Sequence, residues 1–130
     1  MVSGLYAAIL AFIQYALIMR VVKVRNSEKV SLGDGGHEAL QRRIRAHGNF
    51  VETVPMALVL MVIAELSGAP LWSIHVLGLL MVGARVAHAI GINSGTGYGK
   101  FRFYGMVATV VVYILGALLC LWLAFPVLLA

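Results

Sequence analysis

Apolar residues form four long blocks along the chain, and polar residues gather between them. The blocks cover about 5–22, 50–66, 71–92 and 103–130. Each is close to the length of about 20 residues that an α-helix needs to cross a bilayer. The pattern therefore predicts an all-α fold, an antiparallel bundle of four transmembrane helices at about 4–25, 37–66, 70–92 and 102–128. Residues 1–130 are then a single integral-membrane domain.

The composition agrees with this pattern. Hydrophobic residues make up 62% of the chain and charged residues only 12%, more apolar surface than a water-soluble domain of this size can bury. Cys120 is the single cysteine, so an intrachain disulfide is impossible and no metal site built from cysteines is expected.

The net charge of +5 reflects the basic residues, and their positions indicate membrane topology. All ten lie in or toward the first and third loops: Arg20, Lys23, Arg25, Lys29, Arg42, Arg43, Arg45, Arg85, Lys100 and Arg102. The second loop, SGAP at 67–70, and both termini carry none. Because basic loops stay in the cytoplasm, both termini are predicted to lie on the non-cytoplasmic side. Nucleic acid is not an expected partner.

Turn signals separate the predicted helices. The first loop, about 26–36, ends in SLGDGG, where Asp34 is a possible cap for the second helix. That helix is expected to begin near His37 and to extend beyond the hydrocarbon core. Gly68 and Pro70 predict a tight turn before the third helix.

Polar residues inside the second and third blocks form a constellation. Arg45, Asn49 and Glu52 follow the spacing i, i+4, i+7, which places them on one helix face. Arg85 and His88 share a face of the next helix, and Arg85 is expected at the depth of Glu52. Ionisable groups within a span are costly unless they are paired or face a cavity. The sequence therefore predicts a Glu52–Arg85 ion pair with Asn49 and His88 alongside.

Two interpretations of this constellation stay open. The polar residues can simply hold the helices together, and a basic residue near a helix end, taken alone, is typical of interfacial snorkelling. Alternatively, they line a cytoplasm-facing pocket with a basic rim. Such a pocket suits a small polar anion that carries an amine for Glu52 and meets a lipophilic partner dissolved in the membrane.

Several motifs resemble one membrane-protein family. They are RAHGNFVETVP at 45–55, GARVAHAIG at 83–91, VKVR before a loop that ends in GDGG, and an arginine that opens the fourth helix. The chain resembles the membrane-associated proteins in eicosanoid and glutathione metabolism (MAPEG), most closely their small bacterial branch. The resemblance implies a bacterial inner-membrane homotrimer. It also implies glutathione as co-substrate, bound near the cytoplasmic face between helices 1 and 2 of one subunit and helices 3 and 4 of another.

The resemblance also implies residue roles. Arg102 matches the catalytic arginine that stabilises the glutathione thiolate, and a nearby cation does lower the pKa of a thiol. Tyr98 or Tyr104 stands near the position of a tyrosine that follows this arginine. The complete predicted substrate-binding set is Lys23, Arg25, Arg45, Asn49, Glu52, Arg85, His88 and Tyr104.

Departures from the family pattern leave a second hypothesis for the function open. Gly48 stands where glutathione-binding members carry arginine, and Ile92 and Met106 stand where they carry tyrosine. The first hypothesis is a glutathione-dependent membrane transferase or peroxidase acting on lipophilic electrophiles. The alternative is a non-catalytic scaffold or lipid-binding protein of the same fold. A small four-helix transporter is less favoured, because such proteins carry a carboxylate in the first helix and a weaker charge bias.

Overall fold

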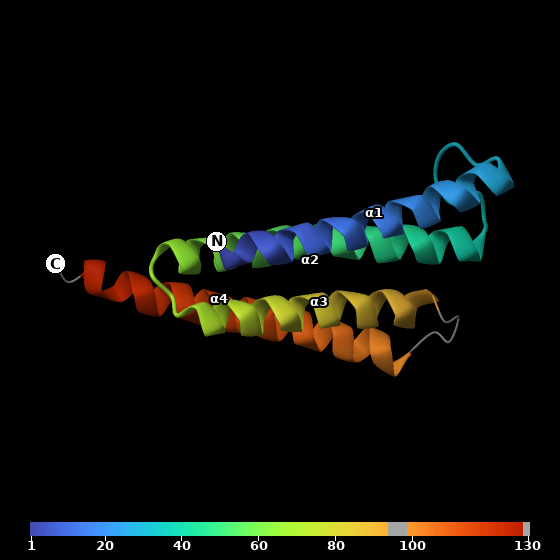
Figure 1. Cartoon of the computed structure of the whole chain (residues 1–130). Coiled ribbons are helices and arrows are strands. Elements are labelled where there is room, and N and C mark those ends of the chain that lie inside the picture. Colours follow the sequence, from blue (N-terminus) through green and yellow to red (C-terminus); the bar gives the residue numbers. More distant parts are fainter. Residues whose placement is uncertain (94–98, 129–130) are drawn as a thin grey trace.

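The computed structural model describes residues 1–93 and 99–128, and within them it contains four α-helices and no strand (Figure 1). The helices are α1 (Val2–Glu28), α2 (Glu38–Leu66), α3 (Leu71–Asn93) and α4 (Lys100–Leu128). All four are long and apolar enough to cross a membrane. The predicted all-α, four-helix membrane bundle is therefore confirmed, with α1 extending further into the first loop than expected.

The helices run antiparallel to their neighbours along the chain (Figure 1). The ends of α1 and α3 lie together with the starts of α2 and α4, and the two chain termini lie at the opposite end of the bundle. In the described part of the chain, α2 and α3 each pack against the other three helices, whereas α1 and α4 do not meet. Because α2 packs against both α3 and α4, side chains from these two helices can meet its polar face.

The core and the outer surface are both apolar. Large exposed side chains such as Phe12, Trp72 and Trp122 cover the outside, as expected for helices whose solvent is hydrocarbon. Inside, the side chains that are almost fully buried include Leu10, Met61, Ile74, Met81 and Val112. The large residues of the core and those of the outer surface are thus similarly apolar, and they differ in how closely they are packed.

Glycines bring α3 and α4 into close contact. A Cβ atom added to Gly91 would lie 2.3 Å from the backbone nitrogen of Arg102, and one added to Gly105 would lie 2.7 Å from the carbonyl oxygen of Ala84. Small residues at such contacts let transmembrane helices approach closely, where dispersion forces and hydrogen bonds hold them. This approach places the first turns of α4, with Arg102, directly beside the last turns of α3.

The turn between α2 and α3 follows the prediction. Gly68 has φ +86°, a left-handed conformation that costs glycine little. The Ala69 amide donates to the Ala64 carbonyl at 2.9 Å and the Gly68 amide to the Glu65 carbonyl at 3.2 Å. These two bonds form a Schellman motif, which closes α2 and reverses the chain within a few residues.

The predicted cap at Asp34 is wrong. The helix begins at Glu38, with His37 as its N-cap residue. The Asp34 carboxylate instead accepts a hydrogen bond from the Gly36 amide at 3.0 Å, and its carbonyl accepts from the His37 amide at 2.9 Å. Asp34 therefore closes a turn within the loop and lies too early to reach the free amides of α2.

Glu65 caps the first helix, a role that the sequence patterns did not indicate. Its carboxylate, at the end of α2, accepts hydrogen bonds from the Val2 amide, from the Ser3 amide at 2.8 Å and from the Ser3 hydroxyl at 2.5 Å. The free amides at a helix N-terminus favour a negative charge. Glu65 thereby ties α1 to α2 at the end of the bundle that carries no basic residues.

The glycine contact between α3 and α4 generates a prediction. Gly91→Ala forces the Arg102 backbone away from α3 and should lower the free energy of unfolding by about 1–3 kcal/mol. Gly83→Ala is the matched control on the same helix, because no atom lies within 4 Å of the added Cβ. Thermal unfolding of the detergent-solubilised protein by circular dichroism measures both. Equal stability of the two variants would contradict close packing at Gly91.

Candidate functional site

Arg85 lies at the centre of the polar region and is only 2% exposed. Its Nη1 donates to the Asn49 side-chain oxygen at 2.6 Å and to the Thr53 hydroxyl at 3.0 Å. Its Nη2 donates to the Gly105 carbonyl at 3.3 Å and to the Thr109 hydroxyl. One guanidinium on α3 therefore cross-links α2 and α4.

The predicted Glu52–Arg85 ion pair is wrong. The Glu52 side chain is 59% exposed and lies 4.0 Å from Arg45 on its own helix. Helical phase explains the difference, because Thr53 lies about 40° to one side of Asn49 and Glu52 about 60° to the other. The face that meets Arg85 is the Asn49–Thr53 face, so Glu52 points away from α3. The shared face of Arg45 and Glu52 on α2 is as expected.

Neutral oxygens replace the expected carboxylate around Arg85. The Thr53 hydroxyl donates to the Asn49 carbonyl at 2.7 Å, and the Thr109 hydroxyl donates to the Gly105 carbonyl at 2.8 Å. Because each hydroxyl proton is used on its own helix, the oxygen lone pairs remain to accept from the guanidinium. Among the described residues no carboxylate lies within ion-pairing distance of Arg85. The region keeps an uncompensated positive charge.

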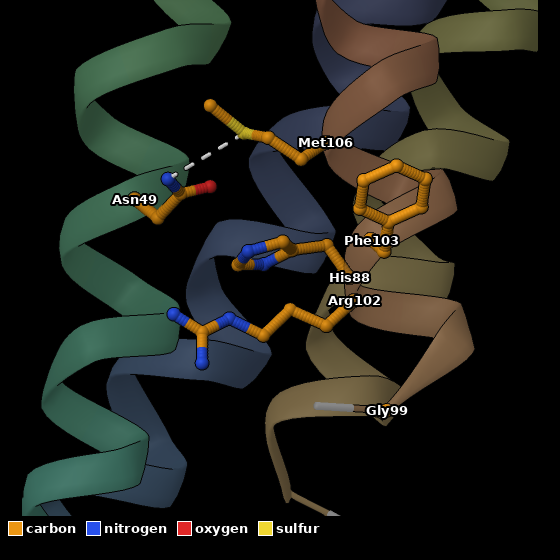
Figure 2. A pocket seen from close by; sticks show the side chains of 6 residues that line it. All are labelled: Asn49, His88, Gly99, Arg102, Phe103 and Met106. Carbon is orange, nitrogen blue, oxygen red and sulfur yellow. Dashed lines mark hydrogen bonds between the residues drawn. The ribbon is translucent and has the colours of Figure 1, made fainter. Parts of the chain in front are cut away.

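Arg85 also fixes the orientation of the Asn49 amide. With its oxygen bound to Arg85, the amide nitrogen points the other way, toward the Met106 sulfur at 4.0 Å (Figure 2). Thioether sulfur is a weak acceptor. A stronger acceptor on a ligand could therefore take the place of this contact, which makes Asn49 a hydrogen-bond donor toward the space beside Met106.

That space is a cavity of about 380 Å³, lined by Asn49, His88, Gly99, Arg102, Phe103 and Met106. Figure 2 shows the Arg102 side chain extending across it toward α2, with the His88 ring between Arg102 and Asn49. The lining combines a cation, an amide, an imidazole and two apolar side chains. This arrangement suits an anion that has an apolar partner beside it.

The structure brings three of the predicted site residues onto this cavity, Asn49 from α2, His88 from α3 and Arg102 from α4. Arg85 lies behind them and reaches the cavity only through Asn49. The cavity is thus formed by α2, α3 and α4 of a single chain. The expected arrangement instead took helix 2 from one subunit and helices 3 and 4 from another. Glu52 does not line the cavity.

The other predicted residues lie apart from the cavity. Lys23 lines a separate recess between α1 and α2. Arg25 donates to the Val30 carbonyl at 3.4 Å in the first loop. Tyr104 packs edge-on against Phe103, with ring centroids 5.5 Å apart, and borders a hollow on the α3–α4 surface. Tyr98 lies outside the described residues.

Sequence reasoning missed the residues that replace Glu52. Thr53 follows Asn49 by four residues and Thr109 lies within an apolar block, and threonine at such a position is also compatible with a hydroxyl bonded only to its own helix. Phe103 was not singled out, and Met106 was noted only because it stands in place of a family tyrosine. The signal for them was their spacing from Arg102 on the first turns of α4.

Comparison with known proteins agrees with this architecture. The family model described as "MAPEG family" matches residues 3–122. Inner membrane protein YecN of Escherichia coli (strain K12) is 38% identical over 122 residues, which cover 94% of this chain and 92% of YecN. YecN of E. coli O6:H1 (strain CFT073) matches with the same identity and coverage.

The network around Arg85 generates a prediction about stability. Arg85→Lys cannot reach oxygens on both α2 and α4, so buried acceptors lose their donor, and the free energy of unfolding should fall by about 2 kcal/mol. Arg45→Lys, the same change on an exposed side chain, should cost no more than about 0.5 kcal/mol. Chemical denaturation of the solubilised variants measures both. A similar loss in the two would show that Arg85 is not the link between the helices.

Proposed function

Since the chain belongs to the MAPEG family, we propose that it is a glutathione-dependent membrane transferase or peroxidase that acts on lipophilic electrophiles. The observation that carries the proposal is the position of Arg102, His88 and Asn49 on one cavity at the end of the bundle where basic residues gather. Glutathione is a polar anion with a thiol, and the electrophile reaches the site from the bilayer.

Arg102 is the residue to which we assign catalysis. Glutathione supplies the nucleophile, because its thiolate sulfur displaces the leaving group of the electrophile. A thiol has an ordinary pKa of about 8.5, and a neighbouring cation lowers it. Arg102 reaches across the cavity with its guanidinium free of any carboxylate within the described residues. It can therefore stabilise the thiolate and the developing anion.

Asn49 and His88 hold the peptide part of glutathione in this proposal. Asn49 donates its amide N–H groups, because Arg85 already occupies its oxygen. The uncompensated charge of Arg85 adds a favourable field for an anion in the cavity. Arg85 is thus a positioning residue, which acts on the ligand through Asn49 and through its charge.

The walls formed by Phe103 and Met106 receive the lipophilic substrate. Phe103 is 63% and Met106 38% exposed on the surface of the chain, so an apolar molecule in the membrane can reach the cavity. Its reactive carbon then lies beside the thiolate held by Arg102, and proximity contributes to the rate.

The remaining predicted residues belong to a proposed homotrimer. Glu52 and Arg45 are exposed on the surface of the single chain. We therefore propose that Glu52 binds the amine of glutathione only in the trimer, where a second subunit closes the site. Lys23 and Arg25 approach from α1 of that subunit. We place the protein in a bacterial inner membrane, as the name of the E. coli relative states for that protein, with both termini on the non-cytoplasmic side.

A second candidate function is a non-catalytic scaffold or lipid-binding protein of the same fold. The contact of Met106 with the Asn49 amide favours it, since a tyrosine at this position could have donated to a ligand and a thioether cannot. Undetectable binding at millimolar glutathione, in a properly folded sample, would favour this function and contradict the enzyme.

Arg102→Gln tests the catalytic assignment. Loss of the cation should lower kcat/KM for conjugation of an aryl halide by about 100-fold or more, and it should abolish the ultraviolet absorbance of the bound thiolate. Lys100→Gln removes a cation from the same turn of α4, outside the cavity, and should change kcat/KM by less than about twofold. The proposal fails if both variants lose the same activity, or if Arg102→Gln retains thiolate and turnover.

Asn49→Asp tests the donor role of Asn49. The new carboxylate keeps the hydrogen bond from Arg85, but it neutralises the positive charge of Arg85 and lacks the N–H donors of the amide. The Kd for glutathione should therefore rise about tenfold. Isothermal titration measures the affinity, and thermal unfolding of the same sample should show no loss of stability. Unchanged affinity in a stable variant would exclude Asn49 from the binding site.

A further inference from the structure

A second cavity lies at the same end of the bundle, between the C-terminal half of α1 and the first turns of α2. It measures about 470 Å³ and is lined by Arg20, Lys23, Ala39, Arg42 and Arg43. Four of these five residues are cations, and none of them lines the cavity of Arg102. We call this cavity the basic recess.

The charges of the basic recess are only partly balanced. Glu38 pairs with Arg42 through one hydrogen-bonded contact at 2.5 Å, and no other carboxylate in the described residues pairs with the four cations. Arg43 donates to the Arg20 carbonyl at 3.2 Å, which holds its guanidinium across the gap between the helices. Cations held this close repel one another, and a bound anion relieves that repulsion.

Nearer the middle of its span, α1 carries an apolar groove on its surface. The groove measures about 520 Å³ and is lined by Ala8, Ala11, Phe12 and Tyr15, with Phe12 77% and Tyr15 62% exposed. Lys23 and Phe12 are eleven residues apart, which places them within about 20° on the helix and about 17 Å apart along it. Arg20 lies about 80° from Phe12 on the helix, so Lys23 is the recess cation of α1 that shares a face with the groove.

We propose that the basic recess binds the phosphate of an anionic phospholipid, with one acyl chain lying along the groove at Phe12 and Tyr15. Arginine forks match phosphate oxygens in pairs, and clusters of basic residues beside a span recognise anionic headgroups. The apolar groove, on the same face of α1 as Lys23, selects a lipid over free phosphate. The proposed glutathione site shares Lys23 with this recess, but Arg20 and Arg43, the residues that the test changes, take no part in the proposed enzymatic function.

Native mass spectrometry of the detergent-solubilised full chain tests the site. Phosphatidylglycerol is titrated against phosphatidylcholine with identical acyl chains, and inorganic phosphate is added as a competitor in a separate series. We expect saturable binding of phosphatidylglycerol at one molecule per chain, above the level of phosphatidylcholine. Arg43→Gln should weaken it about fivefold and the double variant Arg20→Gln/Arg43→Gln about 25-fold.

Lys29→Gln is the matched control, since it removes an exposed cation from the same end of the bundle but outside the recess, and it should leave the affinity unchanged. Thermal unfolding verifies that every variant is folded. Three results would overturn the proposal: equal binding of the two lipids, equal weakening by Lys29→Gln and Arg43→Gln, or full displacement of the lipid by millimolar phosphate. The first two would indicate general surface attraction, and the third a site for free phosphate.

Discussion

The structure depends on one buried cation that is solvated by neutral oxygens. Arg85 lies where water is excluded, and a guanidinium there is costly unless its N–H groups find acceptors. Four oxygens from α2 and α4 accept from its two Nη atoms, whereas the buried Nε has no partner among the described residues. Because these acceptors come from two helices, Arg85 fixes the relative rotation of α2, α3 and α4. The same contacts leave its charge uncompensated beside the cavity, so the requirement for stability also produces a site that favours anions.

Close packing of α3 and α4 makes this network possible. Gly105 gives its carbonyl to Arg85 and, lacking a Cβ atom, lets α4 approach the α3 backbone. Gly91 does the same beside Arg102. A bulkier residue at either position would move the acceptors and the proposed catalytic cation away from α3. In a bilayer, where apolar burial gives little drive for helix association, such contacts carry a large part of the folding energy.

Two basic regions at one end of the bundle follow from one sequence asymmetry. The excess of Lys and Arg in the first and third loops predicts the orientation of the chain in the membrane. In the fold, these basic residues contribute to two separate places, a cavity at α4 and a recess between α1 and α2. The cavity contains the Asn49 donor, which is fixed by a buried network, whereas the recess consists of four cations of which Arg42 alone pairs with a carboxylate among the described residues. These differences suit a small polar ligand in one and a lipid headgroup in the other.

The sequence by itself determined the four spans, their antiparallel order, the turn at Gly68 and the proximity of Asn49 and His88, because hydropathy and helical spacing act locally along the chain. Arg102 joined that set only through the family resemblance. It could not determine the partner of Arg85. Asn49, Thr53 and Glu52 differ by a few tens of degrees on α2, and only the rotation of that helix against α3 and α4 decides which of them meets the guanidinium. The glycine contacts and the Arg85 bonds set that rotation, and they exist only in the tertiary structure.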